Sequence, residues 1–176
     1  MKKVAVIEGG YSKEKAISIK SAKTVFDNMD IDKFNPTRVL IDENEWIAYD
    51  DDGRYSIDKN DFSFIKNGTK HIFEYAFIVV HGTPGEDGKL QGYFDMIGIS
   101  YNTSSAAIMA LTFQKFHCNQ FLKNFGINVP EATLIKPQDV INIRQIIDKV
   151  KLPCFVKPTD GGSSFGVTKV KIENEL

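Results

Sequence analysis

The run Lys3-Val4-Ala5-Val6-Ile7-Glu8-Gly9-Gly10 decides the fold, because it joins a continuous apolar segment to a pair of glycines. An uninterrupted apolar run of this length is typical of a strand that is buried on both faces of a parallel sheet. Two adjacent glycines predict a tight turn directly after that strand. The segment therefore predicts the first strand of an α/β unit.

A helix is predicted after this turn. Ser12 is a candidate N-cap, and Glu14 follows it in what would be the first turn, where the helix dipole favours an ionised carboxylate. A plain βα turn is the commoner explanation of a bare Gly-Gly pair, but ligands of open α/β sheets bind at the carboxyl ends of the strands, and the position of Glu14 favours a site there. Apolar or small residues mark one face of the helix up to about residue 28: Ile17, Ala22, Val25 and Phe26.

Further strands are predicted at residues 37–41 and 46–49, the second of these forming one side of a hairpin. Residues 75–80 are apolar throughout and predict another central strand. Residues 50–70 are polar and acidic, so we interpret them as a surface excursion with a short helix and no part in the chemistry.

A dense polar loop, His81-Gly82-Thr83-Pro84-Gly85-Glu86-Asp87-Gly88, follows the strand at 75–80. If this strand is parallel to the first one, the loop lies at the same edge of the sheet as Gly9-Gly10. His81 could then hydrogen-bond a substrate or serve as a structural histidine, and its neighbours favour the first role.

The second half of the chain begins with a helix that ends at Gly98 and a strand at residues 99–102. A long continuous helix is predicted from 106 to about 124, with Lys115 in its middle. Such a lysine usually extends to water, but it can also deliver its charge into a cleft. A strand at 132–135 and an amphipathic helix at 138–150 follow, with these apolar residues facing inward: Val140, Ile143, Ile146 and Ile147.

The stretch Phe155-Val156-Lys157-Pro158 is predicted to be a strand that leads into a loop rich in glycine and serine, residues 161–166. A second strand over 167–172 completes a hairpin. The glycines let backbone N–H groups approach an anion, and Lys157 adds a positive charge, so the loop could fold over a phosphate. A mobile hairpin tip with a solvated lysine is the alternative, because the spacing matches neither G-x-x-x-x-G-K-[ST] nor G-x-G-x-x-G.

Composition narrows the function classes. The chain has 176 residues, 42% of them hydrophobic, and a formal net charge of −1, which offers no field for nucleic acid or an anionic membrane. It has no signal peptide or membrane-spanning run, so we expect a cytoplasmic protein. Cys118 and Cys154 have neither disulfide nor zinc spacing. The part after Gly126 is too small for a core of its own, so we expect the chain to be the front part of a larger protein.

Four motifs in the same order resemble the D-alanine–D-alanine ligases of the ATP-grasp superfamily. They are Gly9-Gly10-x-Ser12-x-Glu14, the loop from His81 to Gly92, Lys115, and Phe155-Val156-Lys157-Pro158 followed by Gly162-Ser163-Ser164-x-Gly166. The resemblance implies an α/β fold. A parallel, Rossmann-like pre-ATP-grasp domain would span residues 1–101, and an incomplete α+β ATP-grasp lobe would span 102–176.

The resemblance also implies an activity, which is the ATP-dependent joining of two D-alanines through an acyl phosphate for peptidoglycan synthesis. The implied partners are D-alanine, ATP and Mg²⁺, in a homodimer. Glu14, Ile17 and His81 would bind the first D-alanine, Glu14 at its ammonium and His81 near its carboxylate. The ATP phosphates would contact these residues: Lys115, Lys157, Gly162, Ser163 and Ser164. Ser163 would also link to Glu14 and orient substrate, so Glu14 and Ser163 are the implied catalytic residues.

By the same resemblance, the adenine pocket, the Mg²⁺ ligands, the transition-state arginine and the second-substrate loop lie beyond residue 176. Residues 1–176 alone are therefore expected to lack ligase activity. A ligase for another second substrate, such as D-lactate, stays open, as does a non-catalytic fragment that keeps the fold. A dinucleotide-binding domain is disfavoured because Gly9-Gly10 lacks the third glycine.

Overall fold

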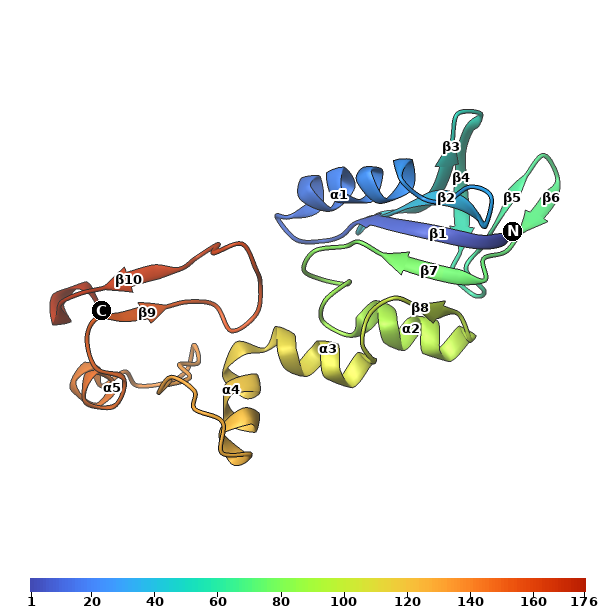
Figure 1. Cartoon of the computed structure of the whole chain (residues 1–176). Helices are drawn as coiled ribbons and strands as arrows, with labels where there is room; N and C mark the ends of the chain where they lie inside the picture. The colour runs from blue at the N-terminus through green and yellow to red at the C-terminus, as the bar shows by residue number, and fades with distance from the viewer. The chain divides into compact units, whose positions relative to one another are not determined.

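The computed structural model describes all residues from 1 to 176 and divides into two compact units, Met1–Ala110 and Leu111–Leu176. The first unit contains an eight-stranded sheet with the strand order β6-β5-β4-β3-β2-β1-β7-β8 (Figure 1). The second unit contains a two-stranded sheet, β10-β9, and short helices.

Strand β1 (Lys2–Gly9) is central in the first sheet. It runs parallel to β2 (Phe34–Ile41) on one side and to β7 (Tyr75–Ile78) on the other, and β8 (Ser100–Tyr101) is parallel to β7. Its apolar run is buried on both faces of the sheet, as the sequence predicts. The expected α/β architecture is therefore confirmed for this part of the chain.

Helices cover both faces of β1. Val4 and Val6 pack with Ala22 of α1 (Lys15–Asp27) in one cluster, whereas alternate residues of β1 join a larger cluster with Leu90 and Phe94 of α2 (Lys89–Ile97). This alternation follows from the period of two along a strand. The loop that follows β1 leads directly into α1 (Figure 1).

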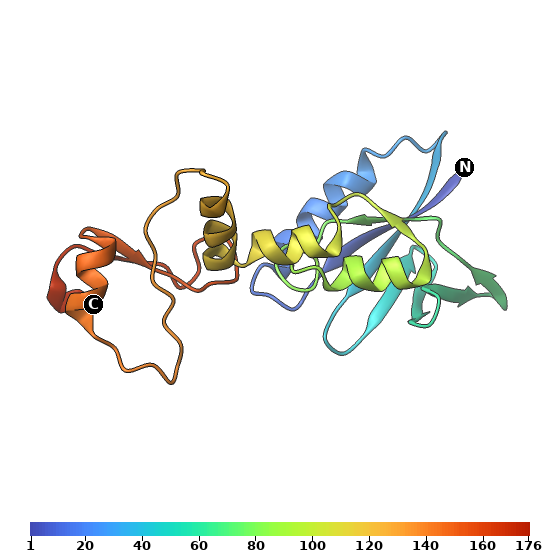
Figure 2. The same ribbon diagram turned by 90° about the horizontal axis from the view of Figure 1, so that it is seen from below.

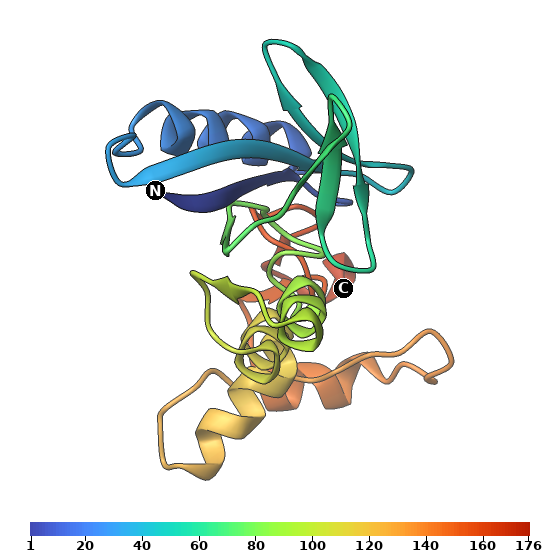
Figure 3. The ribbon, with the colours of Figure 1, turned by 90° about the vertical axis from the view of Figure 1, so that its right-hand side faces the viewer.

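The predicted surface excursion at residues 50–70 is wrong, because this segment extends the sheet. β3 (Trp46–Asp50), β4 (Gly53–Asp58), β5 (Ser63–Lys66) and β6 (Thr69–His71) form antiparallel pairs in succession (Figure 3). β3 also pairs antiparallel with β2, as predicted for the hairpin. Ile57, Phe62 and Phe64 of the segment belong to the main core, and Phe62 is fully buried with its ring 4.9 Å from that of Phe94.

The long helix predicted from 106 to 124 is interrupted. α3 (Ala106–Phe113) and α4 (Lys115–Asn124) are separated by Gln114, whose φ of −85° and ψ of 86° are not helical. The backbone N–H of Lys115 donates to Thr159 O at 2.8 Å and not to a carbonyl of the preceding turn. A long-range hydrogen bond thus stabilises the break, and Lys115 begins a helix instead of lying inside one.

The rest of the second unit contains less regular structure than predicted. α5 (Ile143–Val150) starts only after Asn142, whose side-chain oxygen caps the helix by accepting the N–H of Gln145 at 3.1 Å. The predicted strand at 132–135 is absent, and Val140, expected to face inward, is 99% exposed. The helix prediction was therefore too long at its start.

The predicted hairpin at the end of the chain is confirmed. β9 (Cys154–Val156) pairs antiparallel with β10 (Thr168–Val170), and a 3₁₀ turn, η1 (Glu173–Glu175), follows (Figure 2). Val170 is the one buried residue of the second unit. No helix in residues 1–176 has the length and apolar character needed to cross a bilayer.

Candidate functional site

Two glycine-containing loops meet at the carboxyl edge of β1 and β7, as the sequence predicts for parallel strands. Gly9 and Gly10 have φ values of +93° and +103°. A Cβ on Gly9 would lie 2.4 Å from Ile41 O, so a larger residue would need the backbone to shift. The N–H of Tyr11 donates to Thr83 O at 2.9 Å, which holds the loop after β1 against the loop after β7.

Glu14 is the N-cap residue of α1 and is buried. Its carboxylate lies beside Gly82, because a Cβ built on Gly82 would be 3.5 Å from Glu14 Oε2. The same Cβ would be only 2.7 Å from Ser12 Oγ. A side chain at position 82 would therefore displace Ser12 and would come into contact with the Glu14 carboxylate, which lies at the positive end of a helix dipole.

His81 lies directly beyond β7 with a half-buried side chain, and serine hydroxyls bind both of its backbone polar groups. Its carbonyl accepts from Ser12 Oγ, and its N–H donates to Ser18 Oγ, each at 2.9 Å. The structure thus brings Glu14 and His81 to one edge of the sheet. Ile17 lies in the first turn of α1 and is 48% exposed.

The loop that follows His81 is closed by internal hydrogen bonds. The N–H of Gly82 donates to Glu86 Oε2 at 2.7 Å, and Gln91 Nε2 donates to Gly85 O at 2.7 Å. A Cβ on Gly85 would lie 2.4 Å from Val80 O, so this position also requires glycine. These contacts hold the backbone beside His81 in one conformation.

A pocket of about 290 Å³ lies in the second unit at the loop between β9 and β10. Its lining includes both lysines and all three loop residues identified in the sequence: Lys115, Lys157, Gly162, Ser163 and Ser164. Lys115 contacts this loop twice, since its Nζ donates to Gly161 O and its backbone N–H to Thr159 O. Two positive charges therefore lie in the wall of one small pocket.

The backbone of the pocket loop has an unusual conformation. Gly161 and Gly166 have φ values of +102° and +69°, and Ser163 and Ser164 have +48° and +58° although they carry side chains. Where right-handed and left-handed residues adjoin, successive backbone N–H groups can form a concavity that binds an anion. With two lysines beside them, these N–H groups can bind a phosphate group.

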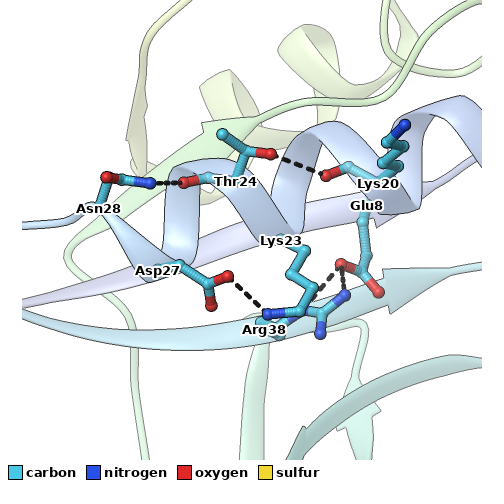
Figure 4. A network of polar contacts seen from close by, with 7 residues as sticks. All are labelled: Glu8, Lys20, Lys23, Thr24, Asp27, Asn28 and Arg38. Carbon is cyan, nitrogen blue, oxygen red and sulfur yellow. Dashed lines mark hydrogen bonds and ion pairs between the residues drawn. The ribbon is translucent and has the colours of Figure 1, made fainter.

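A buried ion pair that the sequence analysis missed lies on the α1 face of the sheet. Glu8 is 1% exposed, and its Oε2 accepts from Arg38 Nε at 3.0 Å and Nη2 at 2.6 Å (Figure 4). The Tyr49 hydroxyl donates to Glu8 Oε1. Burial, with the Glu8 bond as the next cause, raises the pKa of Tyr49 above its ordinary range. This network stabilises the end of β1 near the candidate site.

The sequence analysis also missed Ser18, which is fully buried in α1 and contacts both Glu14 and His81. One signal was available, because a serine in the apolar part of a helix is unfavourable unless its hydroxyl has a partner. Asp160, in the wall of the pocket at the β9–β10 loop, was missed as well.

Comparison with known proteins gives two family matches. Residues 3–104 match the model described as D-ala D-ala ligase N-terminus, and residues 121–176 match D-ala D-ala ligase C-terminus. A relative from Phocaeicola vulgatus, named D-alanine--D-alanine ligase, is 44% identical over 174 residues, which are 98% of this chain and 54% of the relative. One from Azobacteroides pseudotrichonymphae with the same name is 47% identical over 172 residues, 97% of this chain and 53% of the relative.

Solved structures agree with these matches. The D-alanine-D-alanine ligase from Coxiella burnetii has a TM-score of 0.87 and 26% identity, covering 99% of this chain and 58% of that one. VanG D-Ala:D-Ser ligase from Enterococcus faecalis has a TM-score of 0.82 and 29% identity, covering 99% of this chain and 57% of that one. The chain spans about half the length of the curated relatives that it matches.

Proposed function

Because this chain belongs to the D-alanine–D-alanine ligase family, we propose that it forms the front part of an ATP-dependent ligase that joins two D-alanines. The observation that carries the proposal is the pairing of Lys115 and Lys157 in one pocket with a loop of left-handed residues. This arrangement suits the phosphates of ATP, whose negative charge needs cations and N–H donors.

In the proposed reaction, the carboxylate of the first D-alanine attacks the γ-phosphorus of ATP. The bond to the β-phosphate oxygen breaks, ADP leaves, and an acyl phosphate forms. The amine of the second D-alanine then attacks the acyl carbon, and inorganic phosphate leaves as the peptide bond forms. Lys115 and Lys157 would neutralise the negative charge that spreads over the transferred group.

The first D-alanine would bind at the edge of β1 and β7. Its ammonium would pair with the Glu14 carboxylate, its carboxylate would lie near His81, and Ile17 would contact its apolar part. The burial of Glu14 supports this role, because a buried carboxylate gains most from a cationic partner. We also propose that Ser163 links to Glu14 and orients substrate, and that Ser164 and Gly162 contact phosphate.

Mg²⁺ is proposed as a partner of the ligase whose ligands lie outside residues 1–176. No three His, Cys, Asp or Glu side chains in residues 1–176 are grouped so that they could hold a metal ion. No step above depends on such a site in this chain. When bound, the ion would add positive charge at the ATP phosphates.

The second substrate is proposed from the relatives. Those from Phocaeicola vulgatus and Azobacteroides are named for D-alanine, whereas the VanG neighbour is named for D-serine. The higher identity to the former supports D-alanine. The dipeptide would serve peptidoglycan synthesis in the cytoplasm, and a homodimer is proposed from the resemblance, to be tested by sedimentation.

The test uses a joined ligase, defined as residues 1–176 followed by the part of the Phocaeicola vulgatus relative beyond its matched region. We expect it to release ADP and phosphate and to form D-alanyl-D-alanine only when both ATP and D-alanine are present. Residues 1–176 alone should form no dipeptide. The intact relative is the positive control, and circular dichroism establishes that the joined ligase is folded.

A folded joined ligase without dipeptide formation, beside an active relative, would contradict the proposed function. Dipeptide formation by residues 1–176 alone would contradict the proposal that this chain supplies only the front part of the site.

A further inference from the structure

We propose that Ser12 and Ser18 are positioning residues that fix Glu14 relative to His81 and so determine the affinity for the first D-alanine. The inference rests on the proposed function, because it concerns the same site. Neither serine is expected to touch substrate; each acts through the two residues that it joins.

The first bridge runs through Ser12. The backbone N–H of Glu14 donates to Ser12 Oγ at 3.1 Å, and Ser12 Oγ donates to the carbonyl of His81 at 2.9 Å. A hydroxyl group has one proton and two acceptor sites, so it can accept one bond and donate another at the same time. Ser12 thereby links the peptide N–H of Glu14 to the peptide carbonyl of His81.

The second bridge runs through Ser18 in the opposite sense. The backbone N–H of His81 donates to Ser18 Oγ at 2.9 Å, and Ser18 Oγ donates to the carbonyl of Glu14 at 3.3 Å. The two bridges use the N–H and the carbonyl of both Glu14 and His81. Together they close a ring of four hydrogen bonds between residues that are 67 positions apart in the sequence.

Burial makes the bridge through Ser18 the more consequential of the two. Ser18 is 0% exposed, so the His81 N–H would lose its partner if the hydroxyl were removed. An unpaired polar group in a buried position costs more than an ordinary hydrogen bond contributes. Gly82 completes the arrangement, because its missing side chain leaves room for Ser12.

The proposed substrate explains why such a ring would matter. A free amino acid carries its ammonium and its carboxylate a fixed distance apart, and the proposed partners of these groups are Glu14 and His81. The positions of the partners must match that distance for both ends to bind together. Loosening the ring should therefore weaken binding of the first D-alanine more than it affects ATP or the second D-alanine.

The experiment compares four variants of the joined ligase: Ser12→Ala, Ser18→Ala, Ser12→Thr and Ser63→Ala. Fits of initial rates over a wide range of D-alanine concentrations separate the two D-alanine KM values. Each of Ser12→Ala and Ser18→Ala should raise the first KM roughly tenfold, which corresponds to the loss of one hydrogen-bonding partner. The second KM and the KM for ATP should change less than about twofold.

Two variants serve as controls. Ser12→Thr keeps the hydroxyl, so its first KM should stay close to that of the unsubstituted joined ligase. Ser63→Ala removes another buried hydroxyl of the first unit, one that donates to Asp61 Oδ1 at 2.6 Å away from the ring. It should leave the first KM unchanged, which separates positioning from a general loss of stability.

The failures can be told apart. An inactive but folded joined ligase, before any substitution, would contradict the proposed function and the inference with it. An active ligase whose first KM is unaffected by both Ser12→Ala and Ser18→Ala would overturn only the serine bridges. An equal rise in all three KM values, or the same rise in Ser63→Ala, would also overturn them, because it would indicate a structural role alone.

Discussion

Lys157 directly follows β9 and, with Lys115, lines the pocket at the β9–β10 loop. Lys157→Ala in the joined ligase would remove the proposed charge-assisted bond to phosphate, so the KM for ATP should rise about 10- to 100-fold. Lys157→Arg keeps the charge, so its KM for ATP should rise less than that of Lys157→Ala. Lys149→Ala, at an exposed lysine of α5 outside the pocket, is the matched control.

Steady-state kinetics at varied ATP concentrations measure this change. If both the KM for ATP and kcat were the same in Lys157→Ala as in the parent, Lys157 would not be a phosphate ligand.

Glu14 allows an isosteric test at the same scale. Glu14→Gln keeps the volume of the side chain but removes the charge that would pair with the ammonium of D-alanine. The KM for the first D-alanine should rise by about tenfold or more, since a hydrogen bond to a charged group is stronger than a neutral one. Glu74→Gln, at an exposed carboxylate that accepts a hydrogen bond from the N–H of Lys3, is the control and should leave this KM unchanged. An unaltered KM in Glu14→Gln would refute this role.

Tyr49 makes stability depend on alkaline pH. Its pKa is raised in the folded state, so as the pH rises the unfolded chain loses the phenol proton first. The resulting stabilisation is complete below the unfolded pKa of about 10 and is lost as the pH rises from there toward the folded pKa. Tyr49→Phe should remove this dependence, so the free energy of unfolding should fall more steeply above pH 10 in the parent chain.

Urea unfolding of the 176-residue chain between pH 8 and 11 tests the Tyr49 prediction. Parallel curves for the parent and Tyr49→Phe would show that the Tyr49 hydroxyl has the same pKa in both states.

At the scale of elements, β5 provides a matched pair of neighbouring residues. Phe64 is 4% exposed and its ring lies 5.7 Å from that of Phe73, whereas Ile65 on the other side of the strand is 56% exposed. Phe64→Ala should lower the free energy of unfolding by about 3–5 kcal/mol. Ile65→Ala should cost less than about 1 kcal/mol, because little apolar surface is lost from the core.

Urea denaturation of the chain measures both β5 variants. Similar costs for Phe64→Ala and Ile65→Ala would contradict the assignment of β4 to β6 to the main sheet.

The elements that were predictable from sequence are those with a continuous local pattern. β1 and β7 have unbroken apolar runs, and glycines follow each of them closely in the sequence. The sequence therefore located the candidate site at the carboxyl ends of these two strands. β5 has no such pattern, because it is only four residues long and Phe64 gains its burial from rings outside the strand, those of Tyr55 and Phe73. Its strand state is therefore a tertiary effect.

The break between α3 and α4 could not be predicted for a related reason. Gln114 is neither glycine nor proline, and the apolar residues around it favour a continuous helix. The break is stabilised by the bond from the Lys115 N–H to Thr159 O, 44 residues away. The candidate lysine was recognised by its family motif, but the hydrogen bonds that hold it to the pocket loop were visible only in the structure.

On the scale of the whole molecule, burial is concentrated in the first unit. All of the buried residues except Val170 lie in residues 1–110. Slow amide exchange requires opening of buried, hydrogen-bonded structure, so β1 should exchange slowly and β9 and β10 rapidly. Hydrogen–deuterium exchange with mass spectrometry on the 176-residue chain measures this difference. The ATP-binding half of the proposed site would then be the less stable half.

Residues 1–110 alone supply the control for this prediction. They should retain the slow exchange of β1 and a cooperative thermal transition, because they contain nearly all of the buried core. Equal protection of β1 and β9 in the whole chain would contradict the prediction.

The serine ring around Glu14 and His81 also makes the site open to redesign. Its bonds end on peptide groups, which every residue possesses, and not on the side chain at position 81. A library of side chains at that position could therefore alter which amino acid is recognised while the supporting backbone stays in place. Proline is the exception, because it has no N–H to donate to Ser18.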